Sequence, residues 1–236
     1  MLHNKNVLPT ATAIIVAAGS GQRMGGNTNK QFIDISGMPV LAHTLLRFNN
    51  SPSIDSIIVV TKPCFIIDAE KLVDKYRISK VKHIIPGGET RQDSVLCGLK
   101  IAEDNALVAI HDGARPFISV EKINELVSLA HCRGAAALGV IPKDTVKYTS
   151  NQNTISKTID RNSLRLIQTP QVFRASELKS AYQKAYEDGF AGTDDCSVAE
   201  NAGIEIALVD GEYTNIKVTT PDDLPIAEAI YNYLKE

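Results

Sequence analysis

Short apolar runs rich in β-branched residues alternate with amphipathic segments through the first two thirds of the chain. These runs occupy residues 13–18, 57–61, 81–86, 107–111 and 136–141. A strand that is apolar at every position is typical of a sheet covered on both faces. Strands that alternate with helices predict an α/β fold, here a Rossmann-like, mainly parallel sheet with helices on both faces.

The segments between these runs repeat hydrophobic residues every three or four positions, which predicts helices. One helix is predicted to begin at Pro39, because proline suits the first turn of a helix. Its residues Leu41, Leu45 and Phe48 then share one buried face. Further helices are predicted to begin near Asp68, to cover 94–102, and to cover 120–131 after a cap at Ser119.

The alternation stops at a polar, β-leaning region over residues 144–173. Val146 and Tyr148 can pair with Ile155 and Thr158 across a turn at residues 150–153. A two-stranded ribbon is only marginally stable alone, so it needs a surface to pack on. We therefore expect one domain over residues 1–236, with a protruding β-arm at about 144–173 that reaches a second copy in a homodimer.

The remainder of the chain returns to the α/β pattern. It predicts a helix over 176–188, a helix capped by Thr193 and ended by Gly203, strands over 205–209 and 215–218, and a closing helix that starts at Thr220–Pro221.

The charge balance excludes several classes of partner. The chain has 236 residues, of which 44% are hydrophobic, and its 25 basic and 27 acidic residues leave a net charge of −2. This balance gives no general footprint for nucleic acid or an anionic membrane, so any anionic ligand must be bound by local clusters. The four cysteines form no CxxC motif, and the N-terminus has no apolar signal segment, so we expect a cytoplasmic protein.

A glycine-rich stretch, AAGSGQRMGGNTNKQF, follows the first predicted strand at residues 17–32. Backbone N–H groups in such a loop can point at one anion, and the absence of side chains allows a close approach. Neither the P-loop pattern nor the third glycine of a dinucleotide fingerprint is present. Arg23 and Lys30 add positive charge, and the stretch is therefore predicted to bind a polyphosphate.

Two more glycine-bearing loops follow predicted strands, PGGETRQDS at 86–94 and HDGARPF at 111–117. The carboxyl ends of parallel strands meet at one edge of a sheet, which is where such folds bind ligands. Asp112 beside a polyphosphate is a natural ligand for Mg²⁺, which binds through one or two carboxylates and phosphate oxygens. His111 lies within an apolar run and is expected to be structural. The three loops together predict a nucleotide site.

These strings carry a family resemblance. A-A-G-S-G-x-R-M, G-G-x-x-R-x-x-S-V and H-D-G-A-R-P-F resemble the sugar-phosphate cytidylyltransferases. T-I-D-R-N, Q-T-P-Q-x-F, T-D-D-x-S and N-I-K-V-T-x-P-x-D-L resemble the branch that acts on 2-C-methyl-D-erythritol 4-phosphate in non-mevalonate isoprenoid biosynthesis. The match extends over residues 13–230. It implies CTP as co-substrate, Mg²⁺, and a homodimer whose arm contributes to the neighbour's site.

The resemblance also implies a set of site residues. Those around CTP are Ala17, Ala18, Gly19, Ser20, Gly21, Gly87, Gly88, Ser94 and Ala114, with Arg23 and Lys30 on the phosphates and Asp112 on Mg²⁺. Those around the methylerythritol phosphate are Arg115, Thr145, Arg161, Thr169, Thr193 and Lys217. The sequence departs from the family at Asn29, where proline is usual, and at Gln22, where some relatives carry a second arginine.

The implied reaction is attack by a substrate phosphate oxygen on the α-phosphorus of CTP, with release of pyrophosphate. A phosphomonoester is largely dianionic at neutral pH, so no general base is required. Fixed cations must instead offset the repulsion between the two anions, and Arg23, Lys30, Arg161 and Lys217 are the candidates. Lys217 lies in the strand-like run NIKVTT, where a lysine that faced a closed core would be costly.

Other functions remain open from sequence alone. A ribitol 5-phosphate cytidylyltransferase would share the fold, the nucleotide loops and the mechanism. A non-catalytic nucleotide-binding module would bind CTP without releasing pyrophosphate. A nicotinamide-dependent oxidoreductase is disfavoured by the missing third glycine.

Overall fold

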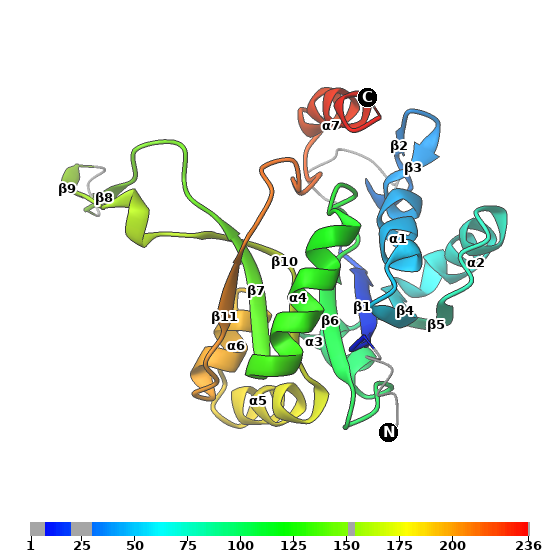
Figure 1. Ribbon diagram of the computed structural model, residues 1–236, viewed down its shortest axis with the longest axis horizontal. Coiled ribbons are helices and arrows are strands. Elements are labelled where there is room, and N and C mark those ends of the chain that lie inside the picture. The colour runs from blue at the N-terminus through cyan, green and yellow to red at the C-terminus, as the bar shows by residue number, and fades with distance from the viewer. Residues whose placement is uncertain (1–7, 20–29, 151–153, 236) are drawn as a thin grey trace, which may run out of the picture.

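Seven strands form the central sheet, in the order β11-β7-β10-β6-β1-β4-β5 (Figure 1). The structure, a computed structural model, describes residues 8–19, 30–150 and 154–235. The strands are β1 (Ala11–Ala17), β4 (Ile54–Thr61), β5 (Val81–Pro86), β6 (Leu107–Asp112), β7 (Ala135–Val140), β10 (Leu166–Arg174) and β11 (Ala207–Asp210). All neighbouring pairs are parallel except those of β10, which is antiparallel to both β6 and β7.

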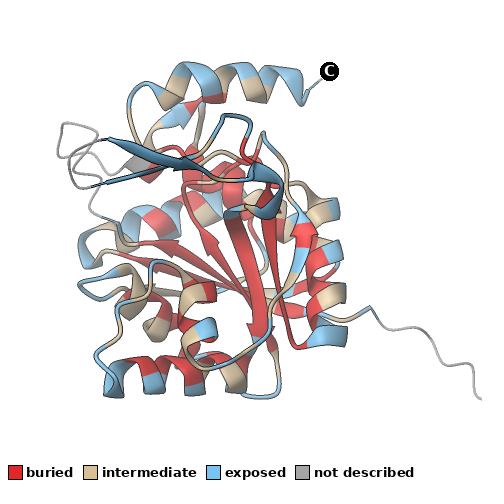
Figure 2. Ribbon diagram, turned by 90° about the vertical axis from the view of Figure 1, so that its left-hand side faces the viewer, coloured by how far each residue is buried: buried red, intermediate tan, exposed pale blue. Residues whose placement is uncertain are grey.

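Helices cover both faces of this sheet. Successive side chains of β1 point to opposite faces, so Ala13 and Ile15 join a hydrophobic cluster with α1, α2 and α4, whereas Ile14 and Val16 join one with α3, α5 and α6. The helices are α1 (Val40–Asn50), α2 (Ile66–Lys75), α3 (Arg91–Leu99), α4 (Val120–Arg133), α5 (Ala175–Glu187), α6 (Asp195–Asn201) and α7 (Asp223–Tyr233). Figure 2 shows the buried sheet between the two layers. The predicted α/β class is confirmed.

Several predicted helix starts shift by a few residues because side chains cap the backbone at a different position. Helix α3 begins at Arg91 rather than residue 94, since Thr90 and Asp93 form a reciprocal capping box. Helix α6 is capped by Asp194 rather than Thr193. The closing helix α7 begins at Asp223, whose carboxylate accepts hydrogen bonds from the backbone N–H groups of Thr219 and Thr220.

Strand β10 corrects the predicted extent of the arm. Residues 166–173 were assigned to the arm because their composition is polar, but they belong to a central strand of the sheet. Its buried polar side chains have partners: Gln171 donates to Asp194 at 2.8 Å and accepts from the backbone N–H of Cys196 at 2.9 Å. A polar residue can be buried at low cost when its hydrogen bonds are made, which composition does not reveal.

The remaining arm is a small two-stranded sheet. Strands β8 (Lys147–Thr149) and β9 (Ile155–Thr158) are antiparallel, every one of their residues is exposed, and the pair projects away from the central sheet (Figure 1). A short 3-10 helix, Arg161–Ser163, follows on the way back to β10.

The segment after β11 also differs from prediction. Residues 215–218 do not form a strand; they run irregularly beside the loop that follows β6, where Val218 N–H donates to the carbonyl of Ala114 at 2.9 Å. Helix α7 follows and packs near the hairpin of β2 (Asp34–Ile35) and β3 (Met38–Pro39). Within the described ranges, no helix combines the length and apolarity needed to cross a membrane.

Candidate active site

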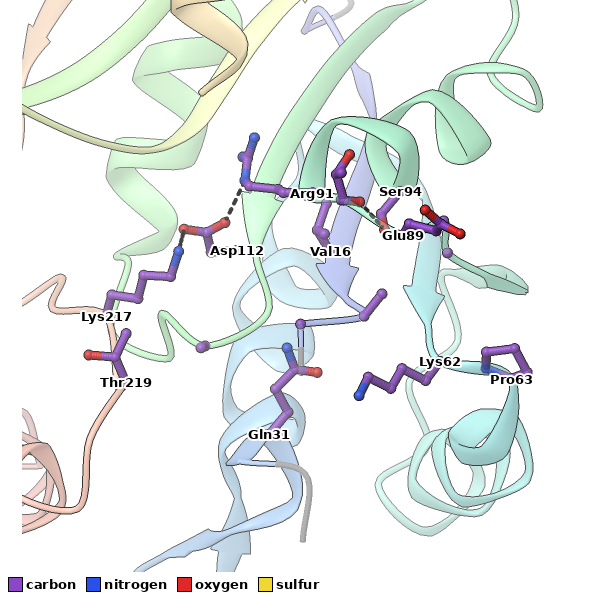
Figure 3. A pocket seen from close by; sticks show the side chains of 16 residues that line it. Val16, Gln31, Lys62, Pro63, Glu89, Arg91, Ser94, Asp112, Lys217 and Thr219 are labelled. Atoms are coloured by element: carbon purple, nitrogen blue, oxygen red, sulfur yellow. Dashed lines mark hydrogen bonds and ion pairs between the residues drawn. The ribbon is translucent and has the colours of Figure 1, made fainter. Parts of the chain in front are cut away.

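A cavity of about 600 Å³ opens at the carboxyl ends of β1, β4, β5 and β6 (Figure 3). The order of the parallel strands brings the described start of the first glycine-bearing loop, Ala18 and Gly19, to this edge together with the other two loops, as the sequence predicted. The cavity is lined by the predicted site residues Ala18, Gly19, Gly87, Gly88, Ser94, Asp112, Ala114 and Lys217.

The first two loops pack against each other with no spare room. A Cβ atom at Gly87 would lie 2.6 Å from the Cβ of Ala18 and 2.6 Å from the Oγ of Ser94. The backbone N–H of Gly87 donates to the carbonyl of Thr61 at the end of β4, at 2.8 Å. Glycine is therefore required at 87 for the loops after β1 and β5 to form one wall of the cavity.

Asp112, the last residue of β6, lies among three cations. Its Oδ1 is 3.2 Å from Arg91 Nε, and its Oδ2 is 2.8 Å from Lys217 Nζ and 3.5 Å from Arg115 Nε. Asp112 is only 7% exposed, so these pairs are screened little by water. Lys217 thus points into the site, and the irregular segment 215–218 is what places it there.

The same charges control protonation. Burial by itself would raise the pKa of Asp112, but the positive charges of Arg91, Lys217 and Arg115 hold that pKa well below its usual range. Arg91 shows the converse: burial opposes its charge, yet Asp195 and Asp112 raise its pKa further. The site therefore carries fixed charges at neutral pH, which suits the recognition of phosphates.

His111 and Thr169 form hydrogen bonds around the backbone of Asp112. The ring of His111 lies 3.0 Å from the carbonyl of Arg115 through Nε2 and 3.1 Å from Thr169 Oγ1 through Nδ1. The Thr169 hydroxyl also accepts the backbone N–H of Asp112 at 3.1 Å. Burial lowers the pKa of His111 to about 4, so the ring is neutral. His111 is structural, as predicted, and Thr169 contacts the backbone of Asp112 rather than the cavity.

Other predicted site residues lie apart from the cavity in this chain. Ala17 is buried at the end of β1, and Arg115 donates to the carbonyl of Asn215 at 2.9 Å while it faces Asp112. Thr193 is exposed in the turn before α6. Thr145 and Arg161 are exposed on the arm, where Arg161 donates to the carbonyl of Lys143 at 2.7 Å. Ser20, Gly21, Arg23 and the side chain of Lys30 lie outside the described residues.

Among the described residues that sequence analysis did not assign to the site, Arg91 and Lys62 line the cavity and Asp195 lies behind its wall. Arg91 is the arginine of the G-G-x-x-R string, so its place after a glycine loop was the available signal. Asp195 is the second aspartate of the T-D-D-x-S string, which was the available signal for it, but its burial and its pairing with Arg91 come from the fold. Lys62 follows β4 and extends into the cavity (Figure 3); within the described part of the chain its ammonium has no hydrogen bond or ion pair.

Comparisons with known proteins identify the family. The sequence profile of 2-C-methyl-D-erythritol 4-phosphate cytidylyltransferase (IspD) matches residues 11–233. The protein of that name from Syntrophus aciditrophicus is 44% identical over 94% of this chain and 95% of its own length, and that from Clostridium acetobutylicum is 46% identical over 92% and 96%.

Solved structures give the same result. The crystal structure of 4-diphosphocytidyl-2C-methyl-D-erythritol synthase from Anaerococcus prevotii superposes with a TM-score of 0.84 at 32% identity and covers 97% of both chains. The 2-C-methyl-D-erythritol 4-phosphate cytidylyltransferase from Thermus thermophilus superposes with a TM-score of 0.77 at 29% identity, over 94% of this chain and 99% of that one. The chain therefore belongs to the 2-C-methyl-D-erythritol 4-phosphate cytidylyltransferase family.

Proposed function

We propose that this protein transfers CMP from CTP to 2-C-methyl-D-erythritol 4-phosphate, giving the 4-diphosphocytidyl derivative and pyrophosphate. The observation that carries the proposal is the cavity in which two glycine loops meet the cluster of Asp112, Arg91, Arg115 and Lys217, in a chain of this family. A phosphate oxygen of the sugar phosphate attacks the α-phosphorus, and pyrophosphate carries away the electrons of the broken bond.

The nucleotide occupies the half of the cavity between the loops after β1 and β5. Glycine at 19, 87 and 88 leaves backbone groups accessible to the base and ribose, and Ser94 and Ala114 complete that wall. Arg23 and Lys30 are proposed to bind the triphosphate and to stabilise the charge that builds at the α-phosphorus. Lys62 follows β4, which lies between β1 and β5 in the sheet, and is proposed to add a further cation for the triphosphate.

Asp112 is proposed to hold Mg²⁺ together with phosphate oxygens of CTP. Each oxygen of a carboxylate has two lone pairs, so the ion pairs with Arg91 and Lys217 leave further acceptor capacity on Asp112. Among the described residues no group of three or more His, Cys, Asp or Glu side chains is arranged to hold a metal. Most ligands must therefore come from the nucleotide and water, as Mg²⁺ commonly requires. When bound, the ion neutralises charge on the phosphates.

Lys217 holds the incoming phosphate in line with the α-phosphorus, while Arg115 acts on it indirectly through its ion pair with Asp112. Thr193 is proposed to contact the sugar phosphate, as the family resemblance implies. Arg161 and Thr145 are proposed to complete this half from the arm of a second copy in a homodimer. Both residues are exposed on the arm, which projects away from the central sheet of its own chain (Figure 1), and this supports the role. A cytoplasmic location stays a prediction from the sequence.

The test is a direct assay. The protein is incubated with CTP, Mg²⁺ and 2-C-methyl-D-erythritol 4-phosphate while pyrophosphate release is followed, with ribitol 5-phosphate in a parallel reaction. Release with the methylerythritol substrate and little with ribitol 5-phosphate is expected. Preference for ribitol 5-phosphate would reassign the substrate, and CTP binding without release from either would indicate a non-catalytic module.

A further inference from the structure

A second group of paired charges lies behind the wall of the cavity. Asp195, the first residue of α6, is fully buried, and the hydroxyl of Tyr182 in α5 donates to its Oδ1 at 2.6 Å. Arg91 donates to the same carboxylate twice, with Nη1 3.2 Å from Oδ1 and Nη2 2.7 Å from Oδ2. Neither Asp195 nor Tyr182 lines the cavity.

Arg91 connects this buried group to the site. Its Nη atoms bind Asp195, while its Nε lies 3.2 Å from Asp112 Oδ1 (Figure 3). A guanidinium is planar and presents its donors in a fixed fork, so holding two nitrogens fixes the direction of the third. The position of Asp195 thereby sets the direction from which Arg91 meets Asp112.

Without Asp195, Arg91 would have other partners within reach. Its two Nη groups would be unpaired and close to Asp112, which has competing bonds to Lys217 and Arg115. A guanidinium released in this way favours a bidentate bond with a carboxylate or a phosphate. Either bond would rotate the Asp112 carboxylate or occupy the oxygens that a metal-bound nucleotide needs.

Stability alone does not account for such an arrangement. A buried ion pair loses the hydration of both ions, and replacing it with apolar residues is often neutral or stabilising. We propose that Asp195, supported by Tyr182, is a positioning residue: it holds Arg91 so that the carboxylate of Asp112 faces the cavity in one orientation. This inference rests on the proposed function.

The main test compares Asp195→Asn, which keeps shape and removes charge, with the wild-type protein. Loss of a group that orients a metal ligand typically lowers metal affinity or activity by about 10- to 100-fold. We therefore expect kcat to fall about 10-fold or more, while the KM for CTP changes less than about threefold. Binding of Mn²⁺ to the complex with a non-reactive CTP analogue, followed by electron paramagnetic resonance, should weaken by about tenfold.

A double-mutant cycle separates positioning from a structural role. If Asp195 acts through Asp112, Asp195→Asn should change kcat less than about twofold in an Asp112→Asn background, because the group it positions is already absent. An equal loss of rate in both backgrounds, or unaltered Mn²⁺ binding in Asp195→Asn, would overturn the proposal.

Tyr182→Phe is a second variant that tests the same proposal if Asp195→Asn does not fold. It removes one hydroxyl from the buried carboxylate and should reduce kcat and Mn²⁺ affinity in the same direction, by about threefold to tenfold. Tyr186→Phe is the matched control: it makes the same change four residues later on α5, where the hydroxyl bonds Asp93 at the surface. Tyr182→Phe indistinguishable from Tyr186→Phe would refute the inference, whereas an inactive wild-type protein would refute the proposed function instead.

Discussion

The cavity and the arm differ in how their charged residues are held. In the cavity, Asp112 is buried and paired with three cations, each of which comes from a different part of the chain. On the arm, Arg161 is exposed, and its side chain donates to the backbone carbonyl of Lys143, close by on the same arm. One half of the proposed site is thus preorganised within a single chain, whereas the residues proposed for the other half are exposed on the arm.

The largest effect is expected from removing the cations proposed for the triphosphate. Arg23→Ala and Lys30→Ala should each lower kcat by about 10²–10³, because each removes a fixed donor from the charge that develops at the α-phosphorus. Steady-state kinetics with both substrates measures this loss. Lys157→Ala on the arm is the control, and normal turnover in a folded Arg23→Ala or Lys30→Ala protein would exclude the role assigned to that residue.

The arm prediction can be tested by mixing two defective chains. Arg161→Ala should raise the KM for the sugar phosphate about tenfold or more with little change in CTP affinity, since it removes one charged contact to a phosphate. The Arg161→Ala and Lys30→Ala chains are then co-expressed, so that half of the randomly formed dimers contain one chain of each kind. If the arm acts on the partner's cavity, each mixed dimer has one intact site, and about a quarter of all sites should be active.

This mixing experiment has a clear opposite outcome. If the arm served the cavity of its own chain, every site in a mixed dimer would still carry one defect. Activity would then equal the average of the two variants. That result would contradict the proposal that the arm completes the partner's site, because both halves of the site would belong to one chain.

A smaller effect is expected when the packing of the cavity wall is disturbed. Gly87→Ala places a methyl group 2.6 Å from Ala18, so the loop must move, and the KM for CTP should rise about tenfold. Gly98→Ala is the matched control: its Cβ would lie 2.5 Å from the Cγ2 of Ile14 in the core, away from the cavity. We expect Gly98→Ala to lower Tm without changing the KM for CTP. An equal KM for CTP in Gly87→Ala and Gly98→Ala would contradict the role of Gly87 in the cavity wall.

The smallest effect is expected on the pH dependence of stability, which depends on the buried His111 next to Asp112. The pKa of His111 is lowered from 6.5 to about 4 by burial, so the folded state binds a proton less readily than the unfolded state. The free energy of unfolding is therefore independent of His111 above pH 6.5. It decreases as the pH falls from 6.5 towards 4, by at most about 1.4 kcal/mol per pH unit, because only the unfolded state takes up the proton. Urea unfolding across this range and NMR titration of the imidazole measure it, and a folded-state pKa near 6.5 would refute the prediction.

The sequence determined the parts of this protein that depend on local pattern. Runs rich in β-branched residues identified the strands β1, β4, β5, β6 and β7. Glycine-bearing loops after three of them identified the cavity edge, because parallel strands share their carboxyl ends. The family strings, which span most of the chain, identified the reaction class.

Tertiary structure decided what depends on distant partners. The polar strand β10 enters the sheet because Gln171 and Thr169 find hydrogen bonds there, and no local pattern shows those bonds. Asp195 meets Arg91, 104 residues earlier, and the irregular segment 215–218 brings Lys217 to Asp112. A buried charge is stable only where opposite charges surround it, and that surrounding forms only when the whole chain has folded.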